Sequence, residues 1–144
     1  MKFKLYSIFI ISSLYLFGCS FRSDLFIQNF KNDDIQFKIV YNIKIDSTWH
    51  KKHILKYVNH IIDPRSFNSN KPISTLDFQT LNDSTIVIKI PKNSTSRIAA
   101  ETNMGYLNKI ESIEFNNKKL SIEEFYNTSV GNNTYRIFKI KSQS

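Results

Sequence analysis

The segment IQFKIVYNIKI, residues 35–45, alternates apolar and polar side chains with a period of two residues. One parity of this segment carries only apolar or aromatic side chains: Ile35, Phe37, Ile39, Tyr41, Ile43 and Ile45. A period of two places these side chains on one face of a β-strand, whereas a helix would scatter them. Val40 breaks the alternation and is expected to face a second apolar surface. The chain is therefore expected to build layered sheets.

Similar short apolar runs recur along the chain and are separated by polar clusters. We expect three antiparallel hairpins: 25–30 with 35–45 around residues 31–34, 75–81 with 84–90 across Asn82-Asp83, and 109–115 with 118–125 across Asn116-Asn117. A last strand is expected at 134–141. Beyond residue 18 the chain has two glycines, Gly105 and Gly131, so asparagine is expected to supply the left-handed turn positions.

Residues 47–64, STWHKKHILKYVNHIIDP, show a different pattern. At helical spacing six apolar side chains fall on one arc: Ile54, Leu55, Tyr57, Val58, Ile61 and Ile62. Ser47 or Thr48 could cap the start, and Pro64 would end the helix near Asp63. The pattern predicts one short amphipathic helix, and a buried strand is the alternative.

Short strands, hairpin turns and one helix together predict a mostly β fold, an antiparallel β-sandwich. The combination of LFIQNFKNDDIQFKIVY, IVIKIPKNSTSRI and IESIEFNNKKLSIEEF followed by NTYRIFKI resembles small immunoglobulin-like lipoproteins of Bacteroidetes. That resemblance implies an immunoglobulin-like sandwich without enzyme activity.

The first eighteen residues, MKFKLYSIFIISSLYLFG, have two lysines followed by an apolar run from Leu5 to Phe17. This run is shorter than the roughly 20 residues that a spanning helix needs, and it predicts a signal peptide. The following Leu16-Phe17-Gly18-Cys19 resembles the lipobox of bacterial lipoproteins. The resemblance implies diacylglycerol on the Cys19 sulfur, cleavage before Cys19 and acylation of the new amino terminus. Cys19 could otherwise be a buried residue of an uncleaved anchor helix.

Three parts are expected: a signal peptide at 1–18, a lipidated tether at 19–24 and a β-sandwich domain at 25–144. Loss of the leader would remove Lys2 and Lys4 and lower the formal charge from +8 to +6. The remaining lysines are scattered and no nucleic-acid motif is present, so a nucleic acid is not an expected partner. Cys19 is the only cysteine, so the domain can form no internal disulfide.

Three histidines, His50, His53 and His60, are the most prominent group of potential metal ligands. On a helix His50 and His53 would lie on neighbouring positions, but His60 would lie about 10 Å further along the axis. Half-buried structural histidines are the preferred interpretation, and no metal or other cofactor is expected. Trp49 is an alternative candidate for stacking on a ligand, although most aromatic side chains of such a domain belong to its core.

Two pairs of carboxylates, Glu111 with Glu114 and Glu123 with Glu124, have the residue types that glycoside hydrolysis requires. Adjacent residues point to opposite sides of a strand, so solvated charges are expected instead. No serine stands in a nucleophile motif, and no glycine-rich phosphate loop is present. The chain is not expected to be an enzyme.

Asp46-Ser47-Thr48 and Asp83-Ser84-Thr85 resemble the acceptor pattern for O-glycosylation of exported Bacteroidetes proteins. The resemblance implies a glycan on Ser47 and on Ser84. The alternative is that Asp-Ser pairs favour turns and helix caps through local hydrogen bonds.

The sequence predicts a non-catalytic envelope lipoprotein whose domain binds another envelope protein. Ser20 to Asp24 lack the acidic pair of a surface-export signal and an aspartate directly after the cysteine, which favours an outer-membrane anchor facing the periplasm. An immunity-type lipoprotein that neutralises a toxin and a metal- or glycan-binding accessory lipoprotein are the alternatives.

Overall fold

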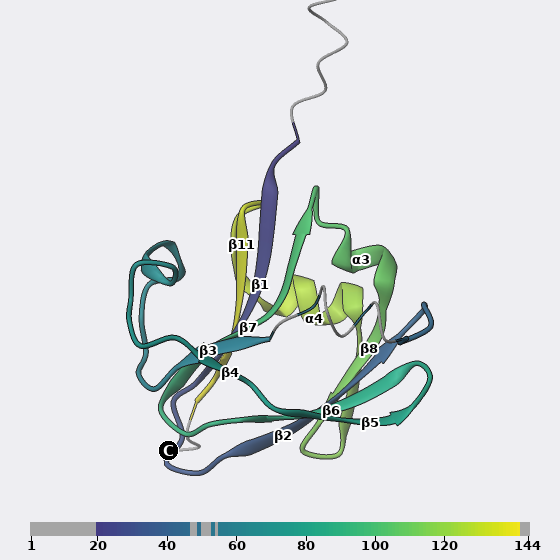
Figure 1. Ribbon diagram of the computed structural model, residues 1–144, viewed down its shortest axis with the longest axis horizontal. Helices are drawn as coiled ribbons and strands as arrows, with labels where there is room; N and C mark the ends of the chain where they lie inside the picture. Colours follow the sequence, from purple (N-terminus) through teal and green to yellow (C-terminus); the bar gives the residue numbers. More distant parts are fainter. Residues whose placement is uncertain (1–19, 47–48, 50–52, 54, 142–144) are drawn as a thin grey trace, which may run out of the picture.

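A computed structural model describes residues 20–46, 49, 53 and 55–141 of the chain. The predicted signal peptide, Cys19, Ser47 and His50 lie outside these residues. The described part is mostly β, with two sheets that pack against each other (Figure 1).

The first sheet, called sheet A, has the strand order β10-β11-β1-β7-β3-β4. Its strands are β1 Arg22–Asn29, β3 Lys56–Val58, β4 Ser74–Thr75, β7 Ser94–Thr102, β10 Val130–Gly131 and β11 Tyr135–Ile140. Neighbouring strands are antiparallel except β1 and β11, which run parallel. The first and last long strands therefore lie side by side.

The second sheet, called sheet B, has the order β5-β6-β2-β8-β9 and is antiparallel throughout. Its strands are β2 Ile35–Tyr41, β5 Phe78–Asn82, β6 Thr85–Ile90, β8 Ile110–Phe115 and β9 Lys118–Ser121. Figure 1 shows sheet B across the end of the molecule opposite the start of β1, with β2, β5 and β6 running at a steep angle to β1.

The main core fills the space between the two sheets. The alternation of β2 places Phe37 and Ile39 inside, where both are fully buried. From β6, Ile86, Ile88 and Ile90 meet them. The predicted β-sandwich is confirmed, and the apolar parity that predicted it forms the inner face of sheet B.

Two of the predicted hairpins are confirmed. Strand β5 pairs with β6, and β8 pairs with β9. Asn116 and Asn117 join the second pair with φ angles of 48° and 60°. Asparagine takes the left-handed conformation there, as the scarcity of glycine predicted.

The predicted hairpin of residues 25–30 with 35–45 is wrong. Strand β1 lies in sheet A and β2 lies in sheet B, so the chain crosses between the layers at residues 30–34. The side chain of Asn29 accepts a hydrogen bond from the Lys31 backbone and donates to the Asp33 carbonyl. These contacts shape the turn by which the chain passes from one sheet to the other. The inner faces of β1 and β2 both pack into the core between the sheets.

The folded domain also begins earlier than predicted. Residues Arg22 to Asp24, assigned to a tether, are already part of β1. The backbone N–H of Phe21 donates to the Asn103 side chain, and the Asn103 N–H donates to the Phe21 carbonyl. The start of β1 is therefore fixed to the turn after β7 by hydrogen bonds.

The predicted helix across 47–64 is wrong for its second half. Trp49 is helical and accepts a hydrogen bond from the His53 N–H, but residues 56–58 form β3. Tyr57 pairs with Ser96 of β7, so sheet pairing outweighs the helical spacing.

The short amphipathic helix of the described chain is α4, Ile122–Thr128, where the sequence predicted the end of a strand. Ser121 accepts from the Glu124 N–H, and the Glu124 carboxylate accepts from the Ser121 N–H, which is a complete capping box. Ile122 and Phe125 are buried in the core. A shorter helix, α3 Tyr106–Lys109, precedes β8.

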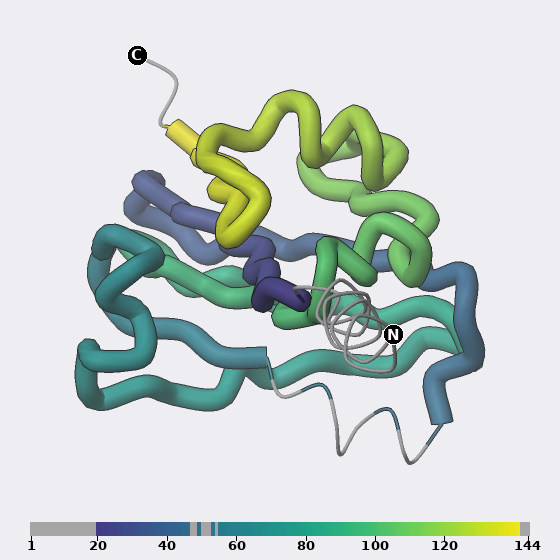
Figure 2. The backbone as a smooth tube through the Cα atoms, turned by 90° about the horizontal axis from the view of Figure 1, so that it is seen from above, coloured from purple at the N-terminus to yellow at the C-terminus, as the bar shows by residue number. Residues whose placement is uncertain are grey.

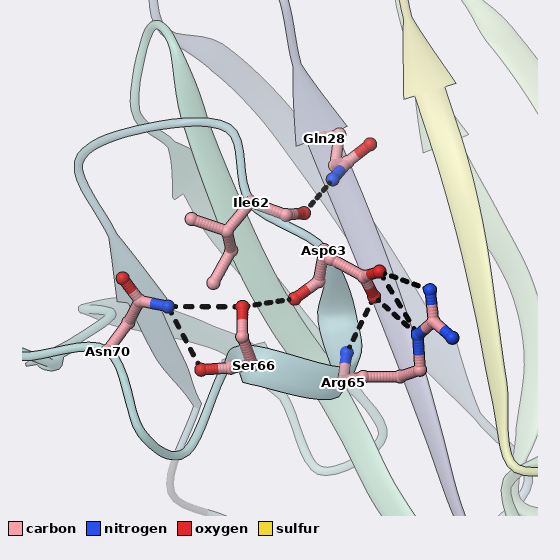
Figure 3. A network of polar contacts seen from close by, with 6 residues as sticks. All are labelled: Gln28, Ile62, Asp63, Arg65, Ser66 and Asn70. Atoms are coloured by element: carbon pink, nitrogen blue, oxygen red, sulfur yellow. Dashed lines mark hydrogen bonds and ion pairs between the residues drawn. The ribbon is translucent and has the colours of Figure 1, made fainter.

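A second apolar cluster lies on the outer side of sheet A. Phe67 packs edge-on against Phe26 at 5.2 Å between ring centroids, together with Val58 and Ile137. The loop 59–73 carries Phe67 and contains the 3₁₀ turn η1 Pro64–Ser66. Gln28 donates to the Ile62 carbonyl, and Asp63 binds Arg65 and the Ser66 hydroxyl (Figure 3). This loop covers β1, which explains why β1 is buried on both faces.

Candidate functional site

The histidines that the sequence singled out do not come together where the structure describes them. His53 lies beside Glu101, while His60 lies in the exposed loop 59–73, where its Nε2 is 3.3 Å from the Asn70 side-chain oxygen. Among the described residues, no three His, Cys, Asp or Glu side chains form a group that could hold a metal ion.

His53 belongs to a half-buried cluster with Glu101 at the end of β7 and Lys109 at the end of α3. The Glu101 Oε1 atom is 3.2 Å from the His53 Nε2 and 2.7 Å from the Lys109 Nζ. The His53 Nδ1 is 3.0 Å from the carbonyl oxygen of Trp49. Both ring nitrogens thus face acceptors. The cluster ties His53 to the end of β7 in sheet A and to the end of α3.

Tyr41 lies next to this cluster, in the core. Burial raises the pKa of its phenol above the ordinary value of 10.0, and the negative charge of Glu101 raises it further. Trp49 is also buried, stacks on the His53 ring at 4.6 Å and meets Tyr41 edge-on. The alternative of Trp49 as an exposed platform for a ligand is therefore wrong, because its ring faces are used in packing.

The two carboxylate pairs of the sequence lie on α4 and β8, and three of their four residues make other contacts. Glu123 and Glu124 lie in α4, where Glu124 completes the capping box. On β8, Glu114 lies 3.0 Å from Lys38, and Glu111 lies 3.8 Å from Lys119. Helix capping and ion pairing with lysine are ordinary roles of carboxylates at a protein surface.

Ser84 lies in the turn between β5 and β6 and is partly exposed. Its hydroxyl donates to the Asn82 side chain at 3.3 Å, and its N–H donates to the same oxygen at 3.0 Å. The Asn82 contact is the local hydrogen bonding expected of a polar turn. The O-glycosylation of Ser84 and of Ser47 stays a prediction.

A shallow groove of about 660 Å³ lies on the outer face of sheet B. A second hollow of about 580 Å³ adjoins it, and the two share Asp34, Gln36 and Val87. The groove runs from the start of β2 to the end of β8 and the turn into β9, and Val87 of β6 also lines it.

The strand register aligns one row of side chains across all five strands of this face. The row contains Gln79, Val87, Lys38, Glu114 and Lys119. Lys38 and Glu114 form an ion pair in its centre, and Lys89 binds Asp34 beside it. The face offers positive, negative and amide groups at strand spacing around one apolar side chain.

The sequence identified the polar parity of residues 35–45 but not this surface. The polar parity of residues 35–45 already holds Lys38, and Glu114 stands two residues before the predicted hairpin turn. Lys38 and Glu114 become neighbours because β2 pairs with β8, and most of the domain's sequence lies between these two strands. Counting register back from the Asn116-Asn117 turn would have placed Glu114 opposite Lys119, although not opposite Lys38.

No helix in the described residues is long and apolar enough to cross a membrane. Comparison with protein-family models, with curated proteins and with solved structures gave no match to this chain.

Proposed function

We propose that this chain is a lipoprotein of a bacterial envelope, acylated at Cys19, whose β-sandwich is a protein-interaction module. The leader followed by Leu16-Phe17-Gly18-Cys19 supports the anchor. Two or more acyl chains hold a protein stably on a membrane, whereas one gives marginal binding. The proposed location is the outer membrane, facing the periplasm.

The observation that carries the interaction role is the outer face of sheet B, whose side chains remain exposed among the residues that the structure describes. The outer side of sheet A packs under the loop 59–73, but on sheet B the side chains of Gln36, Gln79 and Lys119 are exposed. Alternating charge and amide groups on a rigid sheet suit the polar surface of another protein better than they suit a small apolar ligand.

Photo-crosslinking tests the proposed face. A photoreactive residue at Gln36, on sheet B, is compared with one at Ser69, exposed on the loop 59–73. We expect a discrete adduct with one envelope protein from position 36 in native membranes and none from position 69. Equal labelling from both positions, or none from position 36, would contradict a specific partner on sheet B.

The anchor is tested separately with Cys19→Ser. We expect this variant to leave the membrane fraction and the parent to remain there, because the substitution removes the atom that carries diacylglycerol. Intact mass of the purified parent should show cleavage before Cys19 and added acyl chains. A variant that stays bound as tightly as the parent would refute the anchor.

A further inference from the structure

Three chain segments meet at one end of the molecule, here called the proximal end: residues 20–22, 102–105 and 132–134. Phe21 and Asn103 exchange two hydrogen bonds, and the Asp24 N–H donates to the Thr134 carbonyl. Figure 1 shows the start of β1, the end of β7 and the turn before β11 at the same end, and Figure 2 views that end from above.

The proximal end differs in chemistry from the opposite end of β1. Its three segments contain no acidic residue and one cation, Arg22. The two carboxylates next to these segments are both paired with cations: Asp24 with Arg22 at 2.9 Å and Glu101 with Lys109 at 2.7 Å. Phe21 is 37% exposed there, although it is a large apolar side chain. The opposite end, here called the distal end, comprises residues 30–34 and 91–93. It also exposes a phenylalanine, Phe30 at 38%, but it carries two exposed carboxylates, Asp33 and Asp34, beside Lys31 and Lys92.

We infer that the proximal end docks directly on the lipid surface of the bilayer, with Phe21 in the headgroup region and the outer face of sheet B turned away from the membrane. This inference rests on the proposed acylation of Cys19. Only Ser20 separates Cys19 from Phe21, and two peptide units span at most about 7.6 Å. The hydrogen bonds between Phe21 and Asn103 prevent the strand from lengthening this connection.

The chemistry of the proximal end suits this position. An exposed aromatic side chain, a cation and uncharged polar groups are favourable at an interface with anionic headgroups, whereas carboxylates would be repelled. Sheet B lies at the other end of β1 (Figure 1). Docking at the proximal end therefore leaves the groove of sheet B accessible to a partner from the aqueous side.

Phe21 and Phe30 form a matched pair of probe positions, because they flank the same strand with nearly equal exposure. The full acylated protein is placed in phosphatidylethanolamine and phosphatidylglycerol vesicles with brominated acyl chains, as Phe21→Trp or Phe30→Trp. The buried Trp49 of the parent supplies the background. We expect a blue shift and bromine quenching above this background for F21W, and unchanged emission for F30W.

Mass spectrometry of each sample separates the two levels of the argument. If the protein is acylated and bound to vesicles but F21W is not quenched, direct docking is wrong and the anchor stands. Equal quenching of F21W and F30W would overturn the orientation. If no acyl group is found, the proposed anchor fails and the inference fails with it.

A second pair of positions guards against a local effect of tryptophan. Asn133 at the proximal end and Asn32 at the distal end are both exposed. With Cys19 acylated, a spin label on N133C or N32C is the only labelled thiol. We expect collision with a membrane-bound relaxation agent to broaden the N133C signal and to leave N32C unchanged. The reverse pattern would overturn the inference.

Discussion

Asp24 and Arg97 hold opposite charges in the buried zone between sheet A and the loop 59–73. Arg97 is 7% exposed, its Nη1 lies 3.5 Å from the Asp24 Oδ2, and its guanidinium lies over the Phe67 ring. Burial lowers the pKa of Arg97, while the Asp24 charge opposes that shift. The negative charge of Asp24 therefore stabilises the charged form of Arg97 in this buried zone.

We expect Asp24→Asn to lower the free energy of unfolding by about 3 kcal/mol, because it leaves a buried guanidinium without its counter-charge. Urea denaturation measures this loss. Asp63→Asn is the matched control, since Asp63 pairs with Arg65 on the exposed side of the same loop and should change the midpoint little. Equal effects of the two substitutions would mean that the Asp24–Arg97 pair is solvated.

Tyr41 makes the stability of the domain depend on pH in the alkaline range. The fold raises the pKa of its phenol through burial, and then through the Glu101 charge, so folding favours the neutral form. This contribution to stability is complete below pH 10.0, the ordinary value, and is lost as the pH rises above it. We expect the urea midpoint of the parent to fall above pH 10 and that of Tyr41→Phe to fall less. Burial raises the pKa of Tyr106 as well, so some alkaline loss should remain. Identical slopes for parent and variant would contradict this role of Tyr41.

At the scale of elements, the hairpins could be predicted because their information is local. Two asparagines between alternating segments specify β8 and β9 without reference to the rest of the chain. The assignment of β1 and β2 to different sheets could not be read in this way. It depends on β1 pairing with β7 and β11, which lie far along the sequence. The same dependence hid the juxtaposition of Lys38 and Glu114 on sheet B.

The helices show where the spacing of apolar residues misled the prediction. Residues 56–58 belong to a segment with the apolar spacing of a helix, but Tyr57 and Val58 favour a strand. They form β3, which pairs with β7. The helix α4 had a visible local signal in Ser121-Ile122-Glu123-Glu124, the S-x-x-E pattern of a capping box. The apolar alternation of the preceding strand concealed it.

Ser121→Ala tests α4 directly. We expect it to destabilise the domain by about 1 kcal/mol, because it removes the oxygen that caps the Glu124 N–H. Glu124→Gln is the control, since glutamine can still accept from the Ser121 N–H. Thermal unfolding of the three proteins measures both effects. If S121A unfolds at the same temperature as the parent, the segment after β9 is not a capped helix.

At the scale of the whole molecule, sheet A separates two apolar clusters with different tasks. The larger cluster joins the sheets and includes Phe125, which is fully buried. The smaller holds the loop 59–73 on the outside through Phe67. No disulfide supports either cluster, since Cys19 is the only cysteine. Packing between the sheets therefore carries the fold, and packing outside sheet A shields β1.

This division predicts different consequences for two equally buried phenylalanines. Phe125→Ala should reduce global stability by about 3–5 kcal/mol, since it empties a site between the sheets. Phe67→Ala should instead accelerate hydrogen exchange mainly in 59–73 and in the flanking edge strands β3 and β4, because a surface loop can open without separating the sheets. Sheet B would stay intact in F67A, so this variant should still give the adduct from a photoreactive residue at Gln36. In F125A the packing between the sheets is weakened, so this variant should lose the adduct. Loss of the adduct in F67A, with slow exchange retained in sheet B, would instead place the partner on the loop side of the molecule.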